Sequence, residues 1–191
     1  IPVIGEIPFL KDFDKLNDAS PSRSVISESI RMILSNLRFT SLNSNLNDQS
    51  KIILYTSSIK GEGKTLASVS TALSMTNDLV GKKKVILLGT DLRNPQIHKF
   101  FNMDKTKEGI SEIIYKNDYK NYKDYTVRSK NLDILFSGVI PPNPTAMLSS
   151  DTFKNLISLL RKEYDYIIID SAPCLLVSDT FQYIDLADSV V

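Results

Sequence analysis

The sequence predicts an α/β fold in which a mostly parallel sheet is covered by helices on both faces. Short runs that are apolar, except for Asp133, recur at 52–55, 85–88, 132–136 and 166–169, with helical patterns between several of them. Continuous apolar strands are typical of a parallel sheet, because the connecting helices bury both of its faces. A chain of 191 residues is long enough to enclose one substantial core.

The N-terminal part is predicted to lie outside this domain. Residues 1–10 are apolar and interrupted by Pro and Gly, which indicates an extended arm. Residues 11–24 are polar and contain Pro21, which is typical of a linker. We therefore expect an arm and linker over residues 1–23 and a folded domain over residues 24–191.

A helix is predicted to open the domain, with Ser24 or Ser27 as its N-cap. Its apolar side chains recur at helical spacing: Ile26, Ile30, Ile33, Leu34 and Leu37. Glu28, Arg31 and Arg38 share the opposite face. Such a charged face is usually a solvated helix surface.

The remaining elements follow from local patterns. Residues 43–50 are rich in Asn, Ser and Asp and predict a loop. An amphipathic helix follows the first strand and is expected to end near Gly81. Another helix is predicted over about 151–163, and residues 190–191 are expected to begin a further strand.

Composition excludes several classes of function. The net charge of +1 indicates neither a nucleic-acid footprint nor an acidic tail. One cysteine, Cys174, and one histidine, His98, argue against a disulfide and a structural zinc site. No apolar run approaches the roughly 20 residues that span a bilayer. Because the chain begins at Ile1 and stops within an apolar run, we expect it to be a piece of a longer protein.

A glycine-rich run between the first strand and its helix predicts a phosphate site. Gly61 and Gly63 allow close backbone approach, so that the loop amides and the helix N-terminus can face an anion. Lys64 can reach the outer phosphates of a nucleotide, and the hydroxyl of Thr65 can ligate magnesium. A strict motif would place another glycine where Ser58 stands.

Two acidic residues are predicted at the same edge of the sheet. Asp170 directly follows the strand 166–169, in the manner of a Walker B acid, and Asp91 follows the strand 85–88. Ligands of open α/β sheets bind at the carboxyl ends of the strands. An Asp in either place could instead cap a helix, but the glycine loop favours magnesium binding for both.

The second acidic segment, Gly89-Thr-Asp-Leu-Arg93, resembles the Walker A′ motif Asp-x-Asp-x-Arg of bacterial tyrosine kinases. These cytoplasmic domains control the export and chain length of capsular and exopolysaccharides. Further segments similar to that family are the arm Ile-Pro-Val-Ile-Gly-Glu-Ile-Pro at 1–8, Gly-Ile-Ser-Glu at 109–112, Leu-Asp-Ile-Leu-Phe-Ser-Gly at 132–138, Pro-Pro-Asn-Pro at 141–144 and Asp-Ser-Ala-Pro at 170–173, with Asp179 downstream. The resemblance spans nearly the whole chain.

The resemblance implies a P-loop NTPase of the deviant Walker A class, which partition ATPases also use, with ATP or ADP and Mg²⁺ as ligands. The implied nucleotide-binding residues are Ser58, Gly61, Glu62, Gly63, Lys64, Thr65, Leu66 and Arg93. The implied metal ligands are Thr65, Asp91 and Asp170, and the implied catalytic residues are Lys64, Asp91 and Asp170.

The family also implies partners and a location. Its members phosphorylate C-terminal tyrosines from subunit to subunit within a ring, which a helix with Glu-x-x-Arg-x-x-Arg assembles. The corresponding residues are Glu28, Arg31 and, one turn further on, Arg38, because Leu34 replaces the second arginine. Expected partners are a second copy, the transmembrane and periplasmic part of the same polypeptide or a membrane activator, and the polysaccharide export machinery, but no nucleic acid. The expected location is the cytoplasmic side of the bacterial inner membrane.

A departure at Gly89 leaves alternatives open. The family's first A′ acid, which assists the metal and is proposed to activate the acceptor hydroxyl, is Gly89 in this chain. We therefore expect binding to survive and catalysis to be weak unless Asp91 substitutes. One alternative is a non-catalytic, nucleotide-gated assembly module, which Gly89 favours. Another is a partition-type ATPase, which Ile59 disfavours because those relatives carry a second lysine there.

Overall fold

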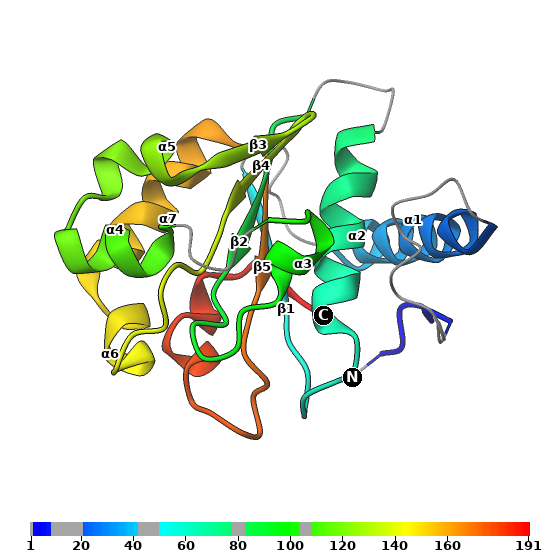
Figure 1. Ribbon diagram of the computed structural model, residues 1–191. Helices are drawn as coiled ribbons and strands as arrows, with labels where there is room; N and C mark the ends of the chain where they lie inside the picture. Colours follow the sequence, from blue (N-terminus) through cyan, green and yellow to red (C-terminus); the bar gives the residue numbers. More distant parts are fainter. Residues whose placement is uncertain (1, 9–20, 42–49, 78–82, 104–107) are drawn as a thin grey trace. The chain divides into compact units, whose positions relative to one another are not determined.

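The computed structural model describes residues 2–8, 21–41, 50–77, 83–103 and 108–191 (Figure 1). The chain divides into two compact units, Ile1–Asp48 and Gln49–Val191. Each unit is described by itself below. Nearly all of the predicted loop 43–50 and the predicted helix end at Gly81 lie outside the described residues.

The larger unit is built on one sheet with the strand order β3-β4-β2-β5-β1-β6. All described pairings are parallel except that of β3 with β4. The strands are β1 Lys51–Tyr55, β2 Val85–Gly89, β3 Val127–Ser129, β4 Leu132–Leu135, β5 Tyr166–Asp170 and β6 Ser189–Val190. The predicted α/β class is confirmed. The edge strand β3 was not predicted, because its three residues lack an apolar run.

The central strand β5 lies between β1 and β2, and its register fixes the site. Asp170 is paired with Tyr55 on one side and with Gly89 on the other. The carboxyl ends of these three strands therefore meet at the same edge of the sheet. That edge is where open α/β sheets bind ligands.

Helices cover both faces of the sheet (Figure 1). One face carries α2 Lys64–Asn77 and α3 Ile97–Phe100, and the other carries α4 Ile110–Lys116, α5 Tyr122–Tyr125, α6 Pro144–Leu148 and α7 Asp151–Glu163. Short 3-10 turns occupy Tyr119–Asn121, Thr180–Gln182 and Ile184–Leu186. The predicted helix 151–163 is confirmed, and the hydroxyl of Ser150 caps it by accepting the Phe153 N–H.

Alternate residues of each strand build the two halves of the core. On the α7 side, Ile52 and Leu54 pack with Phe153 in one buried cluster. On the other side, the hydroxyl of Tyr55 lies 2.7 Å from that of Thr71 on α2. Burial therefore raises the pKa of Tyr55 to about 12, although the hydrogen bond to Thr71 opposes the shift. Because both faces are buried, the central residues of β1, β2 and β5 are all apolar.

The smaller unit contains α1, Pro21–Ser41, and residues of the arm. The helix begins at Pro21, so the prediction of a capping Ser24 or Ser27 was wrong: both residues lie inside the helix. Proline suits the first turn of a helix because it has no N–H to leave unpaired. The arm contacts this helix through the Asn36 side-chain amide, which donates to the Ile4 carbonyl at 2.7 Å.

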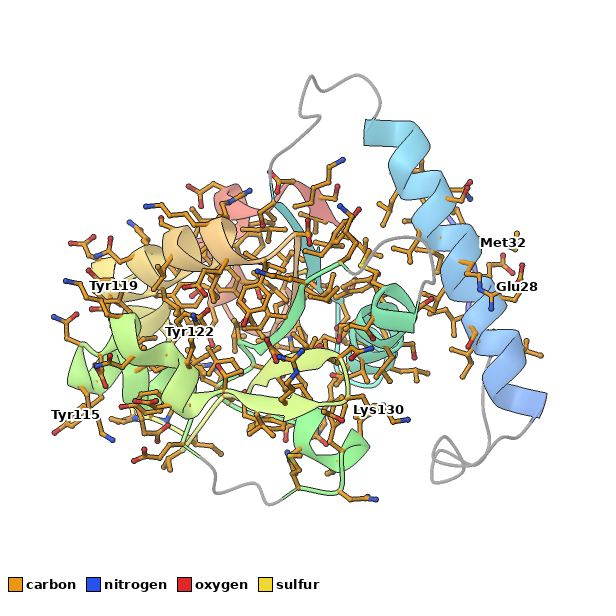
Figure 2. All side chains as sticks on the ribbon, turned by 90° about the horizontal axis from the view of Figure 1, so that it is seen from above. Glu28, Met32, Tyr115, Tyr119, Tyr122 and Lys130 are labelled. Carbon is orange, nitrogen blue, oxygen red and sulfur yellow. The ribbon has the colours of Figure 1, made fainter. Side chains whose placement is uncertain are left out.

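The charged face of α1 is exposed. Glu28 and Arg31 pair at 3.0 Å, with about two thirds of each side chain exposed. Glu28 and Met32 lie on the same side of the helix (Figure 2). The side chain of Arg38 is outside the described part of the chain. Among the described residues, none of the helices has the length and apolar character needed to cross a membrane.

Candidate nucleotide site

The glycines of the loop after β1 are required by its backbone. Gly61 and Gly63 have φ angles of +95° and +90°, which other residues rarely adopt. No atom lies within 4 Å of a Cβ built at either position, so backbone conformation and not space selects glycine there. Ser58 is not among the described residues with positive φ, which explains why the loop tolerates a side chain in place of the strict motif's first glycine.

The side chain of Glu62 shapes the start of this loop. Its carboxylate accepts the Ser58 N–H at 2.8 Å and the Ile59 N–H at 3.2 Å. The loop residues 58–63 are exposed, whereas Leu66, the third residue of α2, is buried. Leu66 could therefore meet a nucleotide only through its backbone.

Four predicted site residues come together at the edge of the sheet. Lys64 Nζ lies 3.3 Å from Asp91 Oδ2 and 3.9 Å from Asp170 Oδ1. The Thr65 hydroxyl donates to Asp170 Oδ2 at 2.9 Å. Lys64 and Thr65 open α2, Asp170 ends β5, and Asp91 follows β2. Three separate elements thus place one cation and two carboxylates at the mouth of the loop.

The environment of Asp170 favours a bound cation. Its side chain is almost completely buried, and its Oδ1 atom accepts no hydrogen bond within the described structure. Burial raises the pKa of Asp170 to about 6, although the charge of Lys64 and the Thr65 hydrogen bond oppose the shift. A carboxylate oxygen and a threonine hydroxyl suit Mg²⁺, which usually binds one or two protein carboxylates together with substrate phosphates. The residues present therefore fit the metal.

Asp91 is held by the turn that follows β2. Its Oδ1 atom accepts the Asn94 N–H at 2.9 Å, while Oδ2 faces Lys64. Thr90, just before it, hydrogen-bonds to the Asp170 carbonyl. Asp91 is 4% exposed. Thus Oδ1 of Asp91 stabilises the turn, and Oδ2 lies in the candidate site.

The position of the missing A′ acid is occupied by a neighbour. The Ser137 hydroxyl donates to the Gly89 carbonyl at 2.7 Å. A Cβ at residue 89 would lie 2.8 Å from that hydroxyl oxygen and 3.2 Å from Ile97 Cδ1. Ser137, which follows the strand β4, therefore fills the space that a larger side chain at residue 89 would need.

The implied nucleotide-binding residue Arg93 contacts an acidic side chain of the same chain. Its guanidinium pairs with Asp179, at 2.7 Å from Nε to Oδ2. The Thr145 hydroxyl donates to the same carboxylate at 2.6 Å. Asp179 and Thr145 were not predicted as site residues, because they lie far from Arg93 in the sequence and carry no local signal of this contact.

The tyrosines near α4 are divided between the core and the surface. The hydroxyl of Tyr122 donates to Glu163 and that of Tyr125 donates to Asp118. Burial is the largest of the causes that raise the pKa of Tyr122 to about 12. Tyr115 is 87% exposed and lies at the outer edge in Figure 2, whereas Tyr122 lies inside it.

Comparison with known proteins identifies the family. Over 169 residues the chain is 34% identical to the tyrosine-protein kinase YwqD of Bacillus subtilis, covering 88% of this chain and 68% of that relative. The chain belongs to the bacterial tyrosine-protein kinase family. It is also 36% identical over 132 residues to the tyrosine-protein kinase CpsD of Streptococcus pneumoniae, and covers 57% of that protein's length. A scan of this chain against protein-family models found no match.

Solved structures confirm the P-loop fold. The chimerical protein CapA2B2 superimposes with a TM-score of 0.81 at 28% identity, over 99% of this chain and 78% of the other. The VpsO kinase domain gives 0.70 at 32% identity, over 90% and 82%. A ParA family ATPase of Chlorobium tepidum gives 0.61 at 14% identity over 74% of this chain and 59% of the other, which shows the shared fold alone.

Proposed function

We propose that this chain is the ATP-binding part of a bacterial protein-tyrosine autokinase. The observation that carries the proposal is the meeting of Lys64 and Thr65 with Asp91 and Asp170 beside the glycine loop, in a chain of this family. The same cluster would bind ADP after transfer.

The roles of the residues follow from their positions. The loop amides and Lys64 would hold the β- and γ-phosphates, and Thr65 and Asp170 would hold Mg²⁺. When bound, Mg²⁺ would neutralise part of the negative charge on the phosphates. Phosphoryl transfer depends mainly on such neutralisation and on positioning, so a tightly held site matters more than a strong base. Asp91, whose Oδ2 atom faces Lys64, would be a further ligand of Mg²⁺. Because residue 89 is glycine, Asp91 would also receive the proton of an acceptor tyrosine.

The test of this function is the appearance of phosphotyrosine. The full-length protein incubated with Mg²⁺ and ATP is expected to gain phosphotyrosine, detected by mass spectrometry, and to gain none when EDTA is present. Phosphotyrosine that forms equally well without divalent metal would contradict the assigned site.

A second function is favoured by Gly89, which replaces the first A′ acid. Without that acid, the chain could act as a nucleotide-gated assembly module. Saturable binding of Mg²⁺-ATP in titration calorimetry, together with no phosphotyrosine in that incubation, would establish the module and exclude the kinase.

We also propose a setting for this activity. The family supports a role in capsule or exopolysaccharide polymerisation and export, at the cytoplasmic face of the inner membrane, with a membrane activator or the transmembrane part of the same polypeptide as partner. A second copy of the chain would be both substrate and neighbour.

The exposed charges of α1 support a ring. Glu28 and Arg31 already pair with each other at the surface, where such a pair contributes about 0–1 kcal/mol to stability. Charges repeated around a ring would instead fix its register. Arg31→Glu is therefore expected to abolish a salt-sensitive self-association in analytical ultracentrifugation while Tm hardly changes. Wild-type protein that stays monomeric at low salt with Mg²⁺ and ATP would rule the ring out.

A further inference from the structure

A fully buried carboxylate lies beside the site without belonging to it. Asp179 is 0% exposed and accepts hydrogen bonds from Arg93 Nε at 2.7 Å, Arg93 Nη2 at 3.0 Å and Thr145 Oγ1 at 2.6 Å. Burial alone would raise the pKa of Asp179, but the hydrogen bonds from Arg93 and Thr145 and the charge of Arg93 outweigh it and lower the pKa. Asp179 is therefore held as a charged carboxylate with both oxygen atoms hydrogen-bonded.

This carboxylate joins three segments that are distant in the sequence. Arg93 follows Asp91 in the turn after β2, Asp179 lies beyond β5, and Thr145 lies in the first turn of α6. The start of α6 is itself fixed, because Asn143 caps it by accepting the Ala146 N–H at 3.2 Å. The Pro-Pro-Asn-Pro segment thus positions the following residue, Thr145, to hydrogen-bond to Asp179.

The turn that carries Asp91 is consequently anchored at both ends. At its start, the Thr90 hydroxyl contacts the Asp170 carbonyl at 3.1 Å and the Tyr183 hydroxyl at 2.6 Å. At its end, Arg93 is bound by Asp179 through two nitrogen atoms. Between the two anchors, Asp91 directs Oδ2 toward Lys64 at 3.3 Å.

We propose that Arg93, Asp179 and Thr145 are positioning residues that hold Asp91 in place for Mg²⁺ and the nucleotide. The inference rests on the proposed function and assigns Arg93 a role through Asp91 instead of direct contact with phosphate. An ion pair with one fully buried member contributes little net stability, because burial of the charge offsets the attraction. Outer groups that orient a metal ligand, in contrast, strongly affect metal affinity.

The test compares ATP binding with and without metal. Asp179→Asn is expected to weaken Mg²⁺-ATP binding by about tenfold, the lower end of the usual effect of outer groups on metal affinity. ATP affinity in EDTA, which depends on the loop amides and Lys64, is expected to stay unchanged. Titration calorimetry measures both affinities, and the Tm of each variant is recorded beside them.

The chain offers a matched control pair away from this edge. Arg161 binds Asp188 through two nitrogen atoms at 3.0 and 3.2 Å, and Asp188 also accepts the Ile52 N–H near the start of β1. Asp188→Asn is expected to lower Tm without changing the ratio of the two ATP affinities. Thr145→Val removes the hydroxyl that donates to Asp179 at 2.6 Å and accepts from Arg93 Nη2 at 3.2 Å, but leaves the ion pair in place. It is expected to change that ratio in the same direction as Asp179→Asn but less, and it replaces Asp179→Asn if that variant does not fold.

The possible outcomes separate the two proposals. If Asp179→Asn and Thr145→Val reduce both ATP affinities equally, or leave both unchanged, the positioning role is overturned. If Asp188→Asn changes the ratio as much as Asp179→Asn does, the effect is general destabilisation and the role is again overturned. If wild-type protein binds no Mg²⁺-ATP, the proposed function itself fails.

Discussion

Replacing Lys64 with alanine is expected to weaken Mg²⁺-ATP binding by roughly two orders of magnitude. The ammonium would contact the outer phosphates, and a hydrogen bond to a charged group is worth about 1.5–3 kcal/mol. In this structure the same ammonium is also the cation between two nearly buried carboxylates, Asp91 and Asp170. Titration calorimetry of the variant and of the wild type measures the loss.

The loss of Lys64 is also expected to change how the fold responds to metal. Without it, Asp91 and Asp170 would repel each other, so Tm should fall in EDTA and recover on adding Mg²⁺. Lys60→Ala, in the exposed part of the same loop, is the control. It should change neither the ATP affinity nor the Tm in EDTA. In cells, Lys64→Ala is expected to alter the chain length of the capsular polysaccharide or exopolysaccharide. Unchanged ATP affinity in the variant would show that Lys64 does not hold the phosphates.

The second large effect concerns the missing acid at Gly89. Gly89→Asp alone is expected to gain little autophosphorylation, because its Cβ would lie 2.8 Å from the Ser137 hydroxyl, which is held by a hydrogen bond to the Gly89 carbonyl. Gly89→Asp combined with Ser137→Ala removes that obstacle. The double variant is expected to gain about 10²-fold in rate, the lower end of what a positioned base contributes.

The control for this gain is Gly89→Asn with Ser137→Ala, which has the same shape without the charge. The initial rate of phosphotyrosine formation is measured for all three variants and the wild type. A double variant no faster than its asparagine counterpart would mean that Gly89 is not the limiting defect and that Asp91 already fills the role.

Much of the fold could be predicted from the sequence, because burial on both faces leaves a direct mark. The strands β1, β2 and β5 have uninterrupted apolar centres, and α7 has a clear cap in Ser150. Asp170 could be predicted because it directly follows such a strand. The start of α1 could not be predicted as well, since Pro21 is compatible both with a linker and with a first helical turn.

The contacts around the site could be predicted only in part. Lys64, Thr65 and the two acids follow from loop chemistry and strand ends, whose geometry is general. The pairing of Arg93 with Asp179 joins residues 86 positions apart, and the contact of Ser137 with Gly89 spans 48. Such contacts depend on how the loops fold over the sheet edge, and the hydrophobic periodicity of the sequence does not predict them. Asn143, which belongs to a segment that resembles the family, caps α6 by accepting the Ala146 N–H and so helps to place Thr145 in that helix.

The most direct test of the central claim is the affinity of the wild-type chain for ATP with Mg²⁺ and in EDTA. The cluster of Thr65, Asp91 and Asp170 predicts saturable binding that is distinctly tighter with Mg²⁺, since the Asp170 Oδ1 atom, which accepts no hydrogen bond in the described structure, would gain a metal ion. Equal affinity with and without Mg²⁺, or no saturable binding at all, would contradict the assignment of this site.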